Sequence, residues 1–221
     1  MSTVSVKAQK GIRMEGPLAR WYAGLTRKSL AEFQALARRA AGEIAPGSRV
    51  LEVAPGPGYF AVELARLGDY HVAGLDISQT FVEIARWNAL QAQVEVDFRQ
   101  GNAAQMPFES DAFDFLLCRA AFKNFAEPLA ALREMHRVLK PGGKALIIDL
   151  RRDASTASIN RAVDGMGLGL VNRIITKLTF RFMLLKRAYT KGEFEAMLAE
   201  TEFRTVEFHE DLIGLEVEMR K

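Results

Sequence analysis

A short apolar run that ends in a Pro/Gly cluster, between residues 50 and 60, constrains the fold of this chain most. The run reads Val-Leu-Glu-Val, the cluster reads Ala-Pro-Gly-Pro-Gly, and apolar residues at helix-compatible spacing follow from 60 to 67. This order predicts a strand, a tight loop and a helix. Gly56 and Gly58 permit positive φ in the loop and allow a ligand to lie against the peptide planes.

A nicotinamide dinucleotide site is one ligand class that uses such a loop. It needs Gly-x-Gly-x-x-Gly, with the pyrophosphate at the helix N-terminus. In this chain the third glycine would fall at Phe60 or Ala61. The loop therefore fits a dinucleotide poorly. A turn that binds nothing is the other interpretation, because short glycine motifs also occur without a ligand.

Polar residues follow the strands expected after the loop. The apolar segment 71–77 contains Asp76 near its end, and an acidic residue there can accept both hydroxyls of an adenosine ribose. Asn102 and Ala103 follow the next strand, and Arg119 ends the strand after that. Ligands of open α/β sheets bind outside the carboxyl ends of the strands, so we expect Asp76 and Arg119 at one site.

The spacing Glu52-x-Ala54-x-Gly56-x-Gly58 resembles motif I of the class I S-adenosylmethionine-dependent methyltransferases, Glu/Asp-x-Gly-x-Gly-x-Gly. Ala54 replaces the first glycine, and we expect its methyl group to cost little room. Further motifs of this family follow in order over residues 45–150. The tract from 121 to 143 is similar to the ubiquinone/menaquinone C-methyltransferase-like branch.

The resemblance implies S-adenosyl-L-methionine as the cofactor. The candidate cofactor contacts lie in the loop, at strand ends or in the N-terminal helical segment: Glu52, Ala54, Gly56, Gly58, Asp76, Ile77, Asn102, Ala103, Arg119 and Tyr22. Removal of a proton from an acceptor would need a general base. His209, expected at the end of strand six, is the first candidate, and Asp149, at the end of strand five, is the second. No metal site is expected, because three scattered histidines and one cysteine offer no ligand spacing.

Alternation of strands and helices predicts an α/β fold. With the resemblance, we expect a Rossmann-like three-layer sandwich: a mostly parallel seven-stranded sheet with an antiparallel last strand, plus a helical cap. The chain would form one domain over 1–221. Its expected parts are an N-terminal helical lid (17–46), a cofactor-binding core (47–150), a helical insert or cap (151–200) and a terminal strand pair (203–221).

Local signals predict three helix starts and one further strand. Ser29-x-x-Glu32 and Thr190-x-x-Glu193 have the pattern of capping boxes, and Ser78 is placed to cap the helix after Asp76. Alternating apolar and charged residues from 94 to 99 predict a strand exposed on one side.

The insert carries the most uneven charge of the chain. Residues 151–187 contain eight Lys and Arg but only two Asp. Within them, residues 168–185 combine apolar positions at helical spacing with Arg173, Lys177 and Arg181, which predicts an amphipathic cationic helix. It could be a cap packed on the sheet edge, a lid over an apolar acceptor, a homodimer contact or a peripheral membrane contact.

Composition excludes several other classes. The 30 basic and 27 acidic residues are interleaved, so the net charge of +3 does not predict nucleic-acid binding. No apolar run is long enough to span a membrane, and residues 1–10 lack the apolar region of a signal peptide. The single cysteine, Cys118, excludes internal disulfides. We expect a cytoplasmic protein.

The residues and the resemblance together predict in-line methyl transfer from S-adenosylmethionine to a small, lipophilic acceptor. Two alternatives stay open. A non-catalytic S-adenosylmethionine-binding regulator would keep the loop and Asp76. A NAD-dependent oxidoreductase would share the fold but requires the third glycine that this loop lacks.

Overall fold

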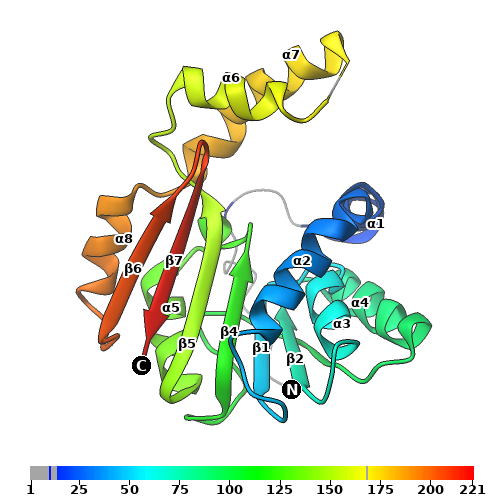
Figure 1. Ribbon diagram of the computed structural model, residues 1–221, viewed down its shortest axis with the longest axis vertical. Helices are drawn as coiled ribbons and strands as arrows, with labels where there is room; N and C mark the ends of the chain where they lie inside the picture. Colours follow the sequence, from blue (N-terminus) through cyan, green and yellow to red (C-terminus); the bar gives the residue numbers. More distant parts are fainter. Residues whose placement is uncertain (1–9, 11–13, 168) are drawn as a thin grey trace.

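The computed structural model describes residue 10 and residues 14–167 and 169–221. Its sheet has the strand order β3-β2-β1-β4-β5-β7-β6 (Figure 1). The strands are β1 (Arg49–Val53), β2 (His71–Asp76), β3 (Asp97–Gln100), β4 (Phe113–Arg119), β5 (Leu139–Leu150), β6 (Thr205–Glu210) and β7 (Gly214–Arg220). Only β7 runs antiparallel to its neighbours. The expected seven-stranded Rossmann-like sheet is confirmed.

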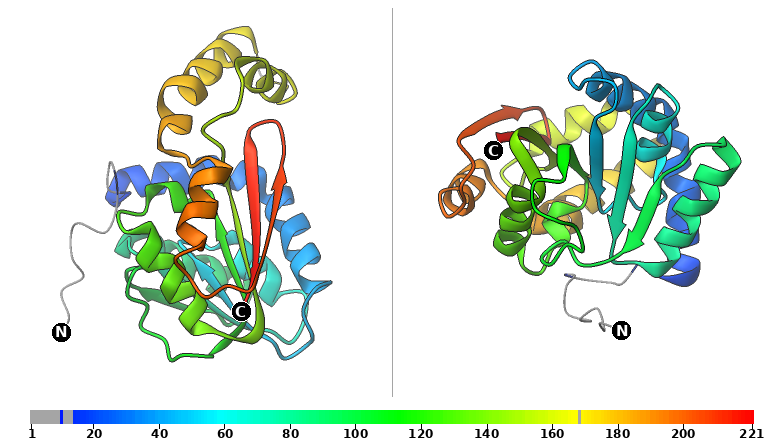
Figure 2. Two further views of the ribbon diagram at one scale, coloured as in Figure 1. Left: turned by 90° about the vertical axis from the view of Figure 1, so that its left-hand side faces the viewer. Right: turned by 90° about the horizontal axis from the view of Figure 1, so that it is seen from below.

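Helices cover both faces of the sheet (Figure 2). The α-helices are α1 (Gly16–Thr26), α2 (Leu30–Ala41), α3 (Tyr59–Ala65), α4 (Gln79–Ala92), α5 (Pro128–Val138), α6 (Thr156–Asp164), α7 (Leu170–Thr179) and α8 (Lys191–Leu198). The shorter turns of helix are Arg27–Ser29, Phe122–Asn124, Phe180–Leu184 and Leu185–Arg187. No helix within the described residues is long and apolar enough to cross a bilayer.

Two apolar cores lie on opposite faces because successive strand residues point to opposite sides. Val50 of β1 packs with α2, α3 and α4 through residues such as Phe60. The next residue, Leu51, packs with α5 and α8 through residues such as Phe194. This double cover explains why β1 is apolar along most of its length. It also leaves the carboxyl ends of the strands as a shared edge for a site.

Two of the three expected caps are confirmed. Ser78 Oγ accepts from Phe81 N–H, and Thr190 forms a full capping box with Glu193. The capping box expected at Ser29 is wrong, because the chain enters α2 through the turn Arg27–Ser29 and Leu30 N–H donates to the Arg27 carbonyl.

The strand expected from residue 94 begins only at Asp97. Val94 N–H donates to the Ala89 carbonyl, so the chain is still completing the end of α4 at that position. A local hydrogen bond that completes the end of α4 therefore overrides the alternating sequence pattern at these positions.

The basic insert forms α6 and, after it, the helix expected over 168–185, which begins at Leu170 as α7 and continues through the turns Phe180–Leu184 and Leu185–Arg187. Both lie beyond the carboxyl ends of the strands (Figures 1 and 2). Ile159, Val163 and Leu185 form a small separate core that joins these helices to the body. The apolar residues of α7 do not pack on the sheet edge: Ile175 and Leu178 are more than half exposed.

Candidate active site

The loop after β1 adopts left-handed backbone conformations at three residues, Ala54 (φ 56°), Gly56 (φ 54°) and Gly58 (φ 75°). Glycine adopts this conformation freely, whereas an alanine there costs about 1 kcal/mol. Replacing the first motif glycine by Ala54 is therefore unfavourable mainly because of the backbone conformation of Ala54, and less because its methyl group occupies space. Such strain is tolerated where the surrounding structure holds the residue in place, and Ala54 N–H is bonded to the Leu75 carbonyl of β2 at 2.8 Å.

Gly56 and Gly58 serve different purposes in this loop. A Cβ added to Gly58 would lie 2.6 Å from Phe98 Cζ and 2.8 Å from Ala85 Cβ, so this glycine allows the loop to pack against β3 and α4. A Cβ added to Gly56 would meet no atom within 4 Å. Gly56 is thus the position where bare backbone faces open space.

Asp76 links the loop to the end of β2. Its Oδ2 accepts from Gly56 N–H at 2.9 Å, and its Oδ1 accepts from Ser78 N–H at 2.9 Å. The side chain is almost fully buried, and burial raises its pKa to about 6, although both hydrogen bonds act in the opposite direction. The carboxylate therefore lies directly beside the open face of Gly56.

Glu52 lies beneath the loop and is 3% exposed. Its Oε2 accepts from Ala61 N–H at 3.0 Å, in the first turn of α3. Burial raises the pKa of Glu52 to about 8, despite the opposing effect of the Arg119 charge. The group is therefore mostly protonated at neutral pH, and it fixes the start of α3 against β1.

Arg119, at the end of β4, points toward the N-terminal helices. Its guanidinium lies 4.5 Å from the ring centroid of Phe33 and 2.8 Å from Glu32 Oε2. Burial raises the pKa of Tyr22 in α1, and the Arg119 charge opposes this shift. Arg119 thus lies between the helical lid and the buried Glu52.

Three further candidates follow β2 and β3. The Ile77 carbonyl accepts from Gln100 Nε2 at 3.2 Å, which ties the ends of the two strands together. Asn102 Oδ1 accepts from Ala104 N–H at 2.9 Å, and both Asn102 and Ala103 are partly exposed. The structure therefore brings the sequence-derived cofactor candidates to the neighbouring carboxyl ends of β1 to β4.

Sequence reasoning missed Glu15. Its carboxylate accepts from Gln79 N–H and from both the N–H and the hydroxyl of Thr80, the hydroxyl at 2.6 Å. These bonds tie the start of α1 to the N-terminus of α4, next to Asp76. No local signal could reveal this contact, since more than sixty residues separate its two sides.

Asp149 is engaged in a buried ion pair with Lys123, a second residue that the sequence did not single out. Lys123 Nζ lies 2.7 Å from Asp149 Oδ1, and Lys123 N–H donates to Oδ2 at 2.9 Å. Lys123 Nζ also donates to the Ala120 carbonyl. With both oxygens bonded and little exposure, Asp149 holds the turn after β4 in place, an arrangement that does not favour a role as general base.

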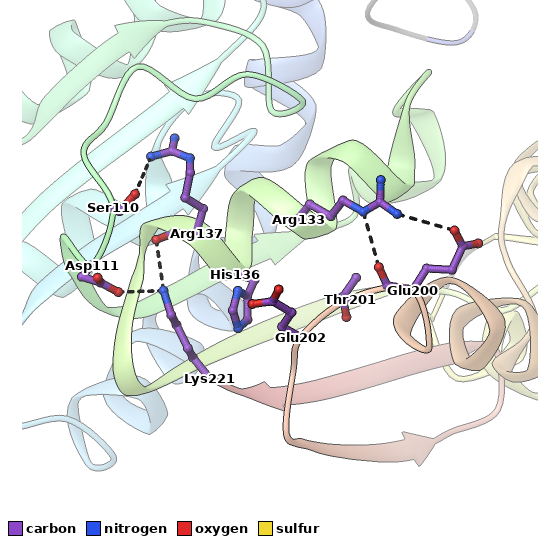
Figure 3. Close-up of a pocket in the computed structure, with 9 residues that line it drawn as sticks. All are labelled: Ser110, Asp111, Arg133, His136, Arg137, Glu200, Thr201, Glu202 and Lys221. Atoms are coloured by element: carbon purple, nitrogen blue, oxygen red, sulfur yellow. Dashed lines mark hydrogen bonds and ion pairs between the residues drawn. The ribbon is translucent and has the colours of Figure 1, made fainter.

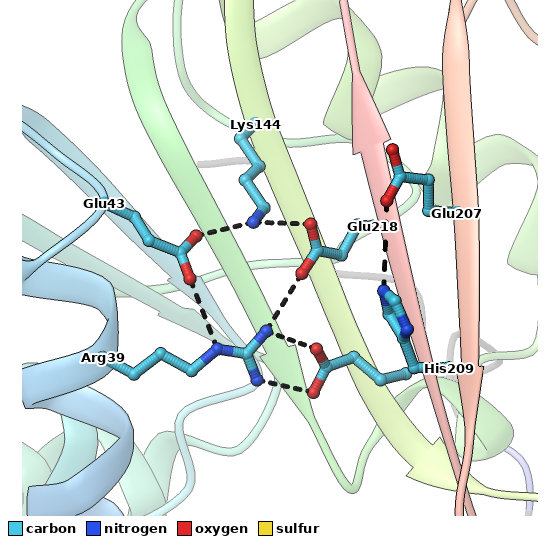
Figure 4. A network of polar contacts seen from close by, with 7 residues as sticks. Arg39, Glu43, Lys144, Glu207, His209 and Glu218 are labelled. Carbon is cyan, nitrogen blue, oxygen red and sulfur yellow. Dashed lines mark hydrogen bonds and ion pairs between the residues drawn. The ribbon is translucent and has the colours of Figure 1, made fainter.

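His209 lies near the carboxyl end of β6, on the same edge of the sheet as the other candidates and level with Arg119, as expected, but it is far from them along that edge. It lies on the edge strand β6, and four strand spacings of about 4.8 Å separate β6 from β1, or about 19 Å. Its side chain is 60% exposed, with Nε2 4.0 Å from Glu207. Figure 4 shows it beside the network of Arg39, Glu43, Lys144 and Glu218.

Cavity volume does not mark the candidate site. A cavity of about 480 Å³ is lined by Asp111, which precedes β4, and by Lys221, which follows β7 (Figure 3). These residues lie at the opposite end of the sheet. Lys221 and Asp111 form an ion pair at 2.7 Å, so charges in this groove compensate one another. The open loop at Gly56 is the better candidate for the active site. The bare backbone of Gly56, the carboxylate of Asp76 and the carboxyl ends of β1 and β2 lie together there.

The fold and the site define a Rossmann-like methyltransferase architecture. A family model described as a methyltransferase domain matches residues 51–147. A structure described as an S-adenosyl-L-methionine-dependent methyltransferase from Methanococcus maripaludis is similar with a TM-score of 0.75 at 19% identity, covering 96% of this chain and 95% of that one. Magnesium protoporphyrin IX methyltransferase from Synechocystis, solved with bound S-adenosylhomocysteine, has a TM-score of 0.61 at 15% identity, covering 87% and 84%.

Curated relatives are similar over parts of the chain. A demethylmenaquinone methyltransferase of Deinococcus radiodurans is 37% identical over 108 residues, which are 48% of this chain and 45% of the relative. A ubiquinone biosynthesis O-methyltransferase of Xanthomonas oryzae is 30% identical over 170 residues, or 76% and 66%. The chain spans about half the length of the first of these relatives. It belongs to the class I S-adenosylmethionine-dependent methyltransferases.

Proposed function

We propose that the protein binds S-adenosylmethionine at the carboxyl ends of β1 and β2 and transfers its methyl group to a small, lipophilic acceptor. The single observation that carries this proposal is Gly56, whose bare α-carbon faces open space while its N–H is bonded to the buried Asp76. The names of the relatives, which concern demethylmenaquinone and ubiquinone biosynthesis, support a quinol-like acceptor.

The hydrogen bonds of Asp76 support a role in holding the ribose. A carboxylate offers about four lone-pair sites, and backbone N–H groups of Gly56 and Ser78 occupy two of them. Two sites remain for two ribose hydroxyls. Asn102 and Ala103 would flank the adenine, and Ile77, Tyr22 and Arg119 would border the same space. Glu52 and Ala54 would shape the loop.

The cofactor would supply an activated methyl group, and its leaving group departs as a neutral thioether. The chain therefore needs to align the acceptor and exclude water more than it needs a strong acid. An acceptor that arrives as an anion needs no protein base. The positions of His209 and Asp149 favour neither as that base, since one lies on the far edge strand and the other is ion-paired.

Calorimetric titration with S-adenosylhomocysteine and with NAD tests the cofactor. We expect S-adenosylhomocysteine to bind and NAD not to bind. Gly56→Ala should lower the affinity at least about tenfold, because a Cβ would enter the space that faces the ligand. Gly47→Ala is the matched control: Gly47 also has positive φ and an open Cβ position, but it precedes β1 at the opposite end of the strand. Absence of S-adenosylhomocysteine binding, or preference for NAD, would overturn the proposal.

Transfer of a labelled methyl group to a panel of quinols and phenols tests the activity itself. Turnover with at least one acceptor would support the enzyme. Tight cofactor binding without turnover on any acceptor would instead support a regulator that binds S-adenosylmethionine.

A further inference from the structure

We infer that α7 and the turn that follows it form a docking surface for an anionic lipid bilayer. This docking surface consists of the exposed apolar residues Leu170, Ile174, Ile175, Leu178 and Phe182 and the cations Arg181, Lys186 and Arg187. It lies beyond the carboxyl ends of the strands, at the end of the molecule where Asp76 lies (Figure 1). The inference concerns a different surface from the cofactor site and does not depend on the proposed acceptor.

The apolar part of the surface is continuous along the helix. Its five members are 51–65% exposed, and they recur at spacings of three and four residues. Single exposed apolar residues are common, whereas a helix face of this kind marks an interaction site. These five side chains take no part in the small core, to which this helical segment contributes the buried Leu185 and, packed against it, Phe180.

The basic residues of this segment indicate that the partner of the docking surface is anionic. Residues 151–187 carry eight basic and two acidic residues, a net charge of +6, whereas the whole chain carries +3, so the remainder carries −3. Arg173 and Lys177 are partly compensated by Asp164. Arg181, Lys186 and Arg187 have no acidic partner among the residues described. Arg181 also lies 5.4 Å from the Phe182 ring, so charge and apolar surface meet at this point.

A bilayer fits this combination better than a second copy of the chain. A two-fold contact through α7 would place the same cations of both copies near each other, and their repulsion would oppose the apolar contact. An anionic headgroup layer instead attracts the cations, while the acyl boundary takes up the exposed apolar residues. The rest of the chain, with its summed charge of −3, would not be attracted to the anionic headgroups.

Vesicle co-sedimentation with the full chain tests the inference. We expect binding to phosphatidylcholine vesicles that contain about a third phosphatidylglycerol, and at least tenfold weaker binding to pure phosphatidylcholine. Raising the salt concentration should weaken the binding to anionic vesicles. The double variant Ile174→Glu/Leu178→Glu should reduce it at least tenfold, because both side chains would then place charge in the acyl boundary.

Two matched controls test whether vesicle binding depends on the docking surface rather than on any exposed apolar or basic residue. Leu90→Glu changes a 66% exposed apolar residue on α4 and should leave vesicle binding unchanged. Arg181→Glu/Lys186→Glu should reduce binding, whereas Lys28→Glu/Arg38→Glu, which alters the net charge equally at exposed positions near and on α2, should not. Titration with S-adenosylhomocysteine verifies that each variant is folded and reports separately on the cofactor site.

Three outcomes would overturn the inference. They are absence of binding to anionic vesicles, equal binding by the α7 variants and the wild type, and self-association in analytical ultracentrifugation that Ile174→Glu/Leu178→Glu abolishes. The last result would show that the surface joins two copies of the chain. Loss of vesicle binding with intact S-adenosylhomocysteine affinity would leave the proposed cofactor site untouched.

Discussion

Two buried carboxyl groups, Glu52 and Asp76, lie at the centre of the candidate site, at the ends of neighbouring strands. The sequence identifies both as acidic, but only burial determines their protonation. Burial raises the pKa of Glu52 to about 8 and that of Asp76 to about 6. At neutral pH the first is mostly neutral and the second mostly charged. Of these two groups, Asp76 therefore carries the negative charge, beside Gly56, where the ribose is proposed to bind.

Glu52 predicts a specific dependence of stability on pH. Its pKa is about 8 in the folded protein and 4.5 when exposed. The folded state thus holds a proton that the unfolded state releases, so this group reduces the free energy of unfolding as pH rises from about 4.5 to about 8. Glu52→Gln removes the titration and keeps an oxygen that can accept from Ala61 N–H.

Urea denaturation at several pH values checks this prediction. The free energy of unfolding of Glu52→Gln should exceed that of the wild type above about pH 8, and the difference should shrink as pH falls toward about 5. Curves that stay parallel across this range would show that Glu52 is not buried in its neutral form.

At the scale of elements, the sequence predictions succeeded or failed at the ends of helices and strands. The sequence correctly predicted the caps at Ser78 and Thr190 because a cap depends on residues three positions apart. It failed at Ser29 and at residue 94, where a preceding turn and a helix end determine the local structure. The buried pair of Lys123 and Asp149 was likewise hidden, because it joins the turn after β4 to the end of β5.

Lys123→Met should destabilise the protein by about 3–5 kcal/mol, because it leaves the buried Asp149 without its partner. Lys140→Met is the matched control: Lys140 pairs with Asp114 at 2.8 Å, but both side chains are at least one-third exposed, and loss of an exposed pair costs about 0–1 kcal/mol. Chemical denaturation measures both values. Adding Asp149→Asn to Lys123→Met should recover part of the loss, and equal losses in the two single variants would contradict the prediction.

At the scale of the whole molecule, the sheet with its two cores and the arm formed by α6 and α7 differ in how firmly they are held. The two main cores extend over both faces of the sheet, whereas the core that anchors the arm buries, among the side chains that the structure describes, only Ile159, Val163 and Leu185. Segments with few buried contacts open at lower free energy than the rest of the protein.

Hydrogen exchange followed by mass spectrometry should therefore show faster exchange in α6 and α7 than in β1, β4 and β5. Helix α5 is the internal control, since it is also a surface helix but buries Leu132, Met135 and Val138 in a main core. Protection of α7 equal to that of α5 in the absence of lipid would contradict this difference.

The sequence by itself determined the layered α/β fold, the loop at Gly56 and the acidic end of β2, because strand and helix periodicity and glycine spacing are local properties of the chain. Only the tertiary structure decided which residues share a site. It brought Asp76 onto the backbone of Gly56, engaged Asp149 with Lys123 and left His209 on the far edge strand. It also left the apolar face of α7 exposed. Those outcomes depend on strand order, burial and contacts between residues distant in sequence, which no local pattern encodes.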